Sequence, residues 1–214
     1  MEFRVQAPQC GYWIEYILDK EQMDFLWEII EDAKKLNKSH KDNLAGNISR
    51  SLILKDTSKD RKFEKLMYPC LKQYLDTDPN LYKTEEFDNS HPESYLLSDF
   101  WVNFQKKHEF NPMHHHGGVF SYVIWMKIPT DWREQHCLPF LDDIAQGKKR
   151  ASDFEFTYTN ILGNICHYTY NLDSDMEGHM LLFPSSLNHQ VYPFYECDDE
   201  RISISGNILL NSGI

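Results

Sequence analysis

Three consecutive histidines, His114, His115 and His116, stand in a segment that reads NPMHHHGGVFSYVIWMK. They are three of the ten histidines of the chain, and a Gly-Gly turn and an apolar run follow them. In an extended segment alternate side chains point to the same face, so His114 and His116 can converge while His115 faces away. Two imidazoles on one face supply two ligands of a mononuclear metal site. The same composition also fits a solvated polar loop, so this segment alone does not distinguish a metal site from a loop.

A second group of polar residues lies near the C-terminal end of the chain. In LLFPSSLNHQVYPF, His189 follows a Phe-Pro-Ser corner at the mouth of an expected strand, where it is either a third metal ligand or a capped surface histidine. Further on, Arg201 and Ser203 share one face of the last expected strand. A guanidinium on an otherwise apolar strand needs an anionic partner, and its planar fork of donors matches a carboxylate. That carboxylate belongs either to a ligand or, in a structural salt bridge, to an Asp or Glu of the chain.

Short β-like runs between turn signals must position these residues. The runs predict an antiparallel sandwich or jelly roll, and the abundance of aromatic residues agrees with a β-rich body. A polar insertion at Thr130–Ser152 is compatible with a short helix at Pro139–Gln146, and it is typical either of a lid or substrate loop or of a surface loop without function. The predicted strands are Asp99–Gln105, Val119–Ile128, Asp153–Thr159, Ile165–Tyr170, His179–Phe183, Gln190–Phe194 and Arg201–Leu210.

The N-terminal third predicts helices that pack on this sheet structure. A short strand is expected at Tyr12–Ile17, and Asp19 can cap the following helix with Gln22 in a capping-box arrangement. Apolar residues then recur at helical spacing. Ile48–Leu54 is expected to be extended, and Asp60–Leu75 shows helical spacing again.

Composition narrows the classes of function. The formal net charge of −11 disfavours binding to a nucleic-acid backbone. No apolar run is long enough to cross a membrane, and the N-terminus lacks the pattern of a secretory signal. The five cysteines are odd in number and form no CxxC pair, so we expect free thiols in a reducing cytoplasm.

In order along the chain, His114-x-His116, His189 and Arg201-x-Ser203 resemble the motifs of the Fe(II)- and 2-oxoglutarate-dependent oxygenases. The similarity is greatest to a small phage and bacterial branch that is prolyl-hydroxylase-like, on the blocks WVNFQKKHEFNPMHHHGGVFSYVIWMKIP, LLFPSSLNHQVYPF and ERISISGNI. It covers Asp99–Ile208, with weaker similarity in the N-terminal helices and in NLAGNI at Asn43–Ile48.

The resemblance implies one oxygenase domain over residues 1–214. It would be mainly β with flanking helices: a double-stranded β-helix of the jelly-roll or cupin-like kind at 95–214, carrying the insertion at 130–152. Residues 1–94 would supply helical and strand support. If the chain is phage-encoded, its location would be the cytoplasm of the bacterial host.

The resemblance also implies a division of roles. His114, His116 and His189 would hold Fe(II), and Arg201, helped by Ser203, would bind the distal carboxylate of 2-oxoglutarate. O₂ would be consumed with release of succinate and CO₂ and hydroxylation of a small-molecule or peptidyl substrate, with ascorbate as reductant. Three further strand residues are candidates for contacts with the co-substrate or for the pocket wall: Asn103, Tyr122 and Trp125.

One residue departs from the wider superfamily, in which most members have Asp or Glu at the position of His116. Three neutral imidazoles would leave the iron centre one unit more positive, while positions for 2-oxoglutarate and O₂ would stay open. Alternatively, a carboxylate from elsewhere completes the site, or only His114 and His189 bind the metal. The rival functions are a cupin-like metal-binding protein or isomerase that does not use 2-oxoglutarate, and a jelly roll without an active site.

Overall fold

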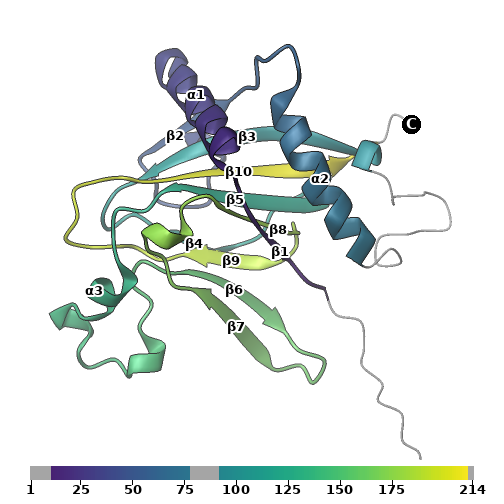
Figure 1. The fold of residues 1–214 in the computed structure, drawn as a ribbon. Coiled ribbons are helices and arrows are strands. Elements are labelled where there is room, and N and C mark those ends of the chain that lie inside the picture. The colour runs from purple at the N-terminus through teal and green to yellow at the C-terminus, as the bar shows by residue number, and fades with distance from the viewer. Residues whose placement is uncertain (1–10, 78–91, 212–214) are drawn as a thin grey trace, which may run out of the picture.

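Two antiparallel sheets face each other in the computed structural model, which describes residues 11–77 and 92–211 (Figure 1). The larger sheet has the strand order β1-β8-β5-β10-β3-β2, and the smaller sheet has the order β4-β9-β6-β7. The strands of the larger sheet are β1 (Ile14–Ile17), β2 (Arg50–Leu54), β3 (Tyr95–Gln105), β5 (Phe120–Lys127), β8 (His179–Pro184) and β10 (Arg201–Leu210). Those of the smaller sheet are β4 (Asn111–His114), β6 (Phe154–Thr159), β7 (Ile165–Tyr170) and β9 (Asn188–Val191).

The winding of these strands makes the fold a double-stranded β-helix, which confirms the predicted fold class. From β3 to β10 the chain passes repeatedly between the two sheets, and only β6 and β7 are consecutive strands of one sheet. Each of the seven predicted runs overlaps a strand. The prediction at Gln190–Phe194 was two residues late, because β9 begins at Asn188 and ends before Pro193, which has no N–H for a sheet hydrogen bond.

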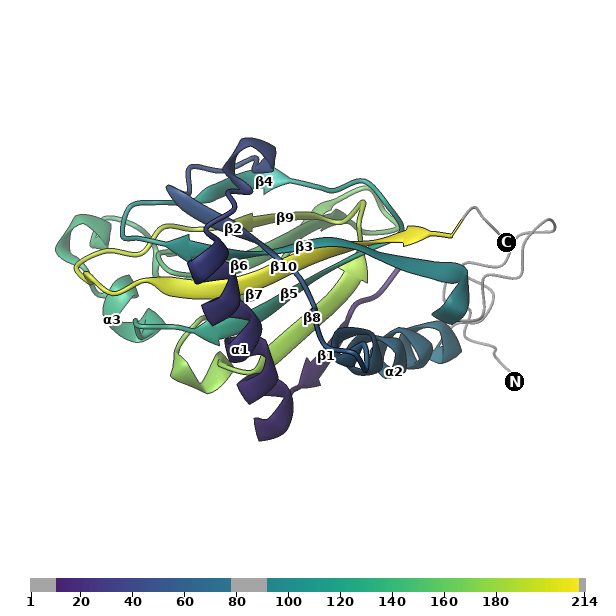
Figure 2. The same cartoon turned by 90° about the horizontal axis from the view of Figure 1, so that it is seen from above.

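Two helices cover the outer face of the larger sheet (Figures 1 and 2). Helix α1 (Lys20–Leu36) begins with the predicted capping box between Asp19 and Gln22 and ends at Asn37 in a left-handed conformation. Helix α2 (Lys62–Thr77) runs through Pro69. None of the helices in the described part of the chain has the length and apolar character that a membrane span requires.

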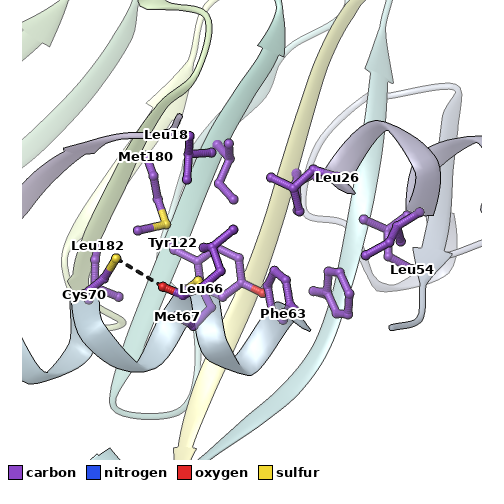
Figure 3. Close-up of a cluster of buried hydrophobic side chains, with 14 of the residues drawn as sticks. Leu18, Leu26, Leu54, Phe63, Leu66, Met67, Cys70, Tyr122, Met180 and Leu182 are labelled. Atoms are coloured by element: carbon purple, nitrogen blue, oxygen red, sulfur yellow. Dashed lines mark hydrogen bonds between the residues drawn. The ribbon is translucent and has the colours of Figure 1, made fainter. Parts of the chain in front are cut away.

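The central strands of the larger sheet, β5, β8 and β10, have two buried faces over most of their length. On β10, Ile202 and Ile204 pack in the cluster under the helices, which Figure 3 shows in part. By the period-two rule, Arg201, Ser203 and Ser205 lie on the opposite face, toward the smaller sheet. The inner face of β10 is therefore a polar stripe, unlike the apolar face that supports the helices.

The insertion folds at one end of the sandwich, as α3 (Trp132–His136) and two short 3₁₀ turns (Pro139–Leu141 and Gln146–Lys148). The helix at Pro139–Gln146 does not form. Residues 142–148 are all exposed, so a helix there would have no apolar face to bury.

Candidate active site

The two sheets bring His114, His116 and His189 together. His114 on β4 is the register partner of His189 on β9. His116 follows β4, and its backbone N–H donates to the Ser185 carbonyl at 2.9 Å. One ring nitrogen of each histidine lies within 4.8 Å of those of the other two, whereas His115 is exposed. The alternation expected from HHH thus agrees with the geometry.

Backbone carbonyls set the tautomer of two of these histidines. Nδ1 of His114 lies 2.7 Å from the Pro112 carbonyl oxygen, and Nδ1 of His189 lies 2.9 Å from that of Leu187. Because a carbonyl only accepts, each Nδ1 carries the proton and each Nε2 has a free lone pair. Such a second hydrogen bond is what orients metal-binding histidines.

Burial keeps all three imidazoles neutral. It lowers the pKa of His189 to about 3 and that of His116 to about 4, and it also lowers the pKa of His114. Neutral imidazole is the form that binds a metal ion. Three converging nitrogen donors fit a divalent first-row metal ion such as Fe(II), and no carboxylate of the described side chains joins the cluster.

Arg201 is buried at the start of β10, with 2% of its surface exposed. Its Nη2 donates to the carbonyl oxygen of Ser152 at 2.8 Å and to the hydroxyl of the same residue, and Nη1 lies 3.4 Å from Gln105 Oε1. Its Nε has no hydrogen-bond partner, and none of the ion pairs in the described part of the chain includes this guanidinium. Burial lowers the pKa of Arg201 to about 10, so it remains charged at neutral pH. The structural salt bridge considered above is therefore not formed among the described residues.

A cavity of about 320 Å³ between the sheets connects the histidines with Arg201. Ser203 and Asn103, which are register partners on β10 and β3, line it. Five buried polar atoms of residues that line it lack a hydrogen-bond partner among the described residues: Trp101 Nε1, Asn103 Oδ1, Asn111 Oδ1, the Tyr122 hydroxyl oxygen and Arg201 Nε. Each such group left unpaired costs about 1–3 kcal/mol, so the cavity is built for a polar ligand.

The two aromatic candidates on β5 point to opposite sides of the sheet. Trp125 belongs to the cluster between the sheets, with its ring 5.7 Å from that of Phe154, and it lines the cavity. Tyr122 borders the cavity as well, but its ring packs 6.0 Å from Phe63 in the cluster under the helices (Figure 3). The Tyr122 ring therefore packs in the helix-facing core, while its buried hydroxyl is one of the unpaired groups of the cavity, and its contact with the co-substrate stays a prediction.

Sequence reasoning missed three residues around the cavity. Trp101 and Gln105 share a face of β3 with Asn103, so the same alternation pattern could have found them. The ring of Trp101 lies 6.1 Å from that of His116 and stacks on His40 at 4.5 Å. His40 comes from the segment before β2, where no periodic pattern could have indicated it.

Comparison with known proteins identifies a family and supports the fold. A family model described as "Putative 2OG-Fe(II) oxygenase" matches residues 99–207. A search of curated proteins found no match. Among solved structures, the chain is similar to a prolyl-4-hydroxylase from Pseudomonas putida at 14% identity and a TM-score of 0.52, over 94% of each chain.

Two further structures share the fold. An oxidoreductase of the 2OG-Fe(II) oxygenase family from Burkholderia pseudomallei has 11% identity and a TM-score of 0.50, over 92% of this chain and 85% of that chain. A prolyl hydroxylase from Trichoplax adhaerens, in complex with a peptide fragment of hypoxia inducible factor, has 12% identity and a TM-score of 0.50, over 92% and 81%. At these identities the likeness shows the fold alone.

Proposed function

This chain belongs to the 2OG-Fe(II) oxygenase family, and from that premise we propose that it is a dioxygenase that hydroxylates a substrate with release of succinate and CO₂. The observation that carries the proposal is the convergence in one cavity of three neutral histidines and one buried arginine that has no carboxylate partner among the described residues. The proposal takes residues 1–214 as one domain, in which the N-terminal helices support the β-helix.

Six polar residues of the cavity have a role in this proposal. His114, His116 and His189 would hold Fe(II), the first and the last through Nε2, and the metal would supply the chemistry of O₂ activation with electrons from 2-oxoglutarate. Arg201 binds the distal carboxylate of 2-oxoglutarate, with Ser203 as a further hydrogen-bond donor. Asn103, the register partner of Ser203, presents its amide beside the same ligand. Ascorbate is the proposed reductant.

The end of the cavity away from Arg201 is proposed to receive the substrate. Trp101 pairs with Ser205 on β10, and Arg201 pairs with Gln105, so these two ends lie on the order of 13 Å apart along the strands. Apart from Arg201, no Asp, Glu, Lys or Arg is among the described residues that line the cavity. Burying a charge without a partner is costly, so the group that enters is uncharged.

Two kinds of substrate meet this requirement. One is an uncharged residue within a peptide, since the Trichoplax adhaerens prolyl hydroxylase was solved with a peptide. The other is a neutral small molecule. The net charge of −11 argues against nucleic acid, and the four described cysteines are free thiols, in line with the proposed cytoplasmic location.

The test is succinate formation by purified protein supplied with Fe(II), 2-oxoglutarate, O₂ and ascorbate. We expect succinate in wild-type protein and its loss in His189→Ala. In the absence of O₂, addition of 2-oxoglutarate should also change the optical spectrum of the Fe(II) protein. A protein that binds Fe(II) but shows neither response is a metal-binding protein or isomerase of the cupin-like kind, and this result would contradict the proposal.

A further inference from the structure

The guanidinium of Arg201 is held from one side by the end of the insertion. Nη2 donates to two oxygen atoms of the same residue, Ser152: the carbonyl oxygen and the side-chain hydroxyl. The contact of Nη1 with Gln105 is longer, at 3.4 Å, and Nε has none. Nη2 is therefore committed to Ser152, whereas Nε is left for a ligand in the cavity that Arg201 lines.

Ser152 is itself fixed in an unusual conformation. It is fully buried and has a φ of +72°, which is uncommon for a residue other than glycine. Its N–H donates to the Pro193 carbonyl at 2.8 Å, and its hydroxyl lies 2.9 Å from that of Thr130, where the insertion begins. Both ends of the insertion thus meet at the residue that holds Arg201. Such strain persists only where surrounding contacts impose it.

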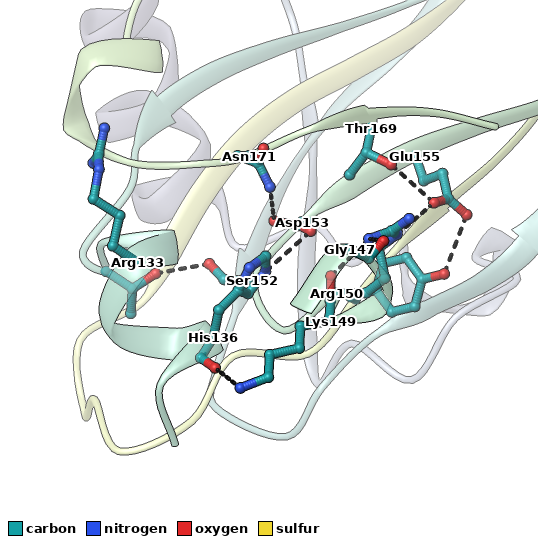
Figure 4. A network of polar contacts seen from close by, with 12 residues as sticks. Arg133, His136, Gly147, Lys149, Arg150, Ser152, Asp153, Glu155, Thr169 and Asn171 are labelled. Carbon is teal, nitrogen blue, oxygen red and sulfur yellow. Dashed lines mark hydrogen bonds and ion pairs between the residues drawn. The ribbon is translucent and has the colours of Figure 1, made fainter. Parts of the chain in front are cut away.

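The neighbouring carboxylate, that of Asp153, is hydrogen-bonded to two other side chains, His136 and Asn171 (Figure 4). Asp153 is fully buried, and its two oxygen atoms lie 3.2 Å from Nε2 of His136 and 3.1 Å from Nδ2 of Asn171. His136 belongs to α3, so the insertion contributes the group that occupies this carboxylate. Asp153 contributes negative charge near Arg201 without a hydrogen bond to it.

We propose that Ser152 is a positioning residue for Arg201, and that the insertion is a fixed support of the co-substrate pocket rather than a lid. The inference rests on the proposed function, because Arg201 is its contact with the distal carboxylate of 2-oxoglutarate. Holding a fork of donors in place before the ligand arrives reduces the conformational freedom that binding must remove. Ser152 acts through Arg201 and does not touch the ligand.

The test compares two ligands in anaerobic Fe(II) protein by calorimetry. 2-Oxoglutarate carries the distal carboxylate, and 2-oxobutyrate has the same α-keto acid group without it. Ser152→Gly removes the hydroxyl and suits the positive φ, so the fold is retained. We expect its Kd for 2-oxoglutarate to rise by about tenfold to a hundredfold, the scale of one hydrogen bond to a charged group, while the Kd for 2-oxobutyrate stays unchanged.

Two more variants serve as a second substitution at Ser152 and as a control. Ser152→Ala should weaken 2-oxoglutarate binding in the same selective way. Cys70→Ala changes a buried side chain in the cluster under the helices, where its Sγ bonds the Leu66 carbonyl away from the cavity, and it should alter neither Kd. An unchanged affinity for 2-oxoglutarate in Ser152→Gly, or equal weakening of both ligands, overturns the inference alone. Failure of the wild-type protein to bind 2-oxoglutarate overturns the proposed function as well.

Discussion

Replacing Arg201 with methionine should separate a ligand-binding role of this residue from a structural one. Burial lowers the pKa of Arg201 from 12.5 to about 10, and one pKa unit corresponds to about 1.4 kcal/mol. A base with a lowered pKa is destabilising while charged, so at neutral pH the guanidinium costs the fold about 3 kcal/mol. Methionine removes this cost and loses two hydrogen bonds from a charged donor to Ser152, worth about 1.5–3 kcal/mol each. The ligand-free variant should therefore be about as stable as wild type, or less stable by up to about 3 kcal/mol.

Thermal unfolding of the anaerobic Fe(II) protein tests this expectation. A ligand at 100 times its Kd stabilises the folded state by about 2.7 kcal/mol, which raises the Tm of a chain of this size by about 5–10 °C. 2-Oxoglutarate should produce this shift in wild type and none in Arg201→Met.

Arg150→Met is the matched control. Arg150 donates to buried Glu155 at 2.8 Å, so its loss leaves a carboxylate without its cation and should lower the Tm, while the 2-oxoglutarate shift is kept. If Arg201→Met lowers the Tm as Arg150→Met does, and 2-oxoglutarate still raises it, then Arg201 is a structural residue and the reasoning is refuted.

Three further predictions concern the metal site, the buried carboxylate and the segment before β2. His189→Ala should abolish Co(II) binding in an optical titration, whereas His115→Ala should leave it intact; loss of binding in both would refute the ligand assignment. Burial raises the pKa of Asp153 from 3.8 to about 7, so the unfolded chain releases this proton first. Its contribution to the free energy of unfolding should therefore fall by up to about 4 kcal/mol between pH 4 and pH 7. In urea unfolding at several pH values, the free energy of unfolding of Asp153→Asn should fall less between pH 4 and pH 7 than that of wild type. An equal fall in both proteins would show that another group causes it. A Cβ at Gly46 would lie 1.5 Å from Asn111 Oδ1, so Gly46→Ala should destabilise the fold by about 1–3 kcal/mol in the same assay, and unchanged stability would show that the Asn111 side chain can move.

The strands could be predicted because β10 and its neighbours must satisfy two different environments. Along RISISGNI, Ile202 and Ile204 alternate with Arg201 and Ser203, and the sheet places the two sets on opposite faces. β5 lacks this signal. Its sequence FSYVIWMK is buried on both faces, so apolar residues do not alternate with polar ones. The sequence therefore could not show which of Tyr122 and Trp125 faces the helices and which faces the smaller sheet.

The parts of the site that come from loops could not be predicted. Ser152 reaches Arg201 because a left-handed backbone turns at the end of a 23-residue polar insertion, Thr130–Ser152, and no periodic rule covers such a contact. His40 reaches Trp101 from a segment that only the tertiary structure brings to the cavity. In contrast, His114, His189 and Arg201 stand on strands, and pairing carries each of them to a position that alternation allows.

Charge explains why three imidazoles and one arginine form a coherent site. The described residues that line the cavity include no Asp or Glu, so a divalent metal and Arg201 together would bring three positive charges. In most of the superfamily a carboxylate stands where His116 stands and offsets one of these charges. Here the dianion 2-oxoglutarate would itself supply the negative charge, one carboxylate beside the metal and one at Arg201. Because opposite charges attract strongly where water is excluded, the site should favour dianionic 2-oxo acids over neutral or monoanionic analogues.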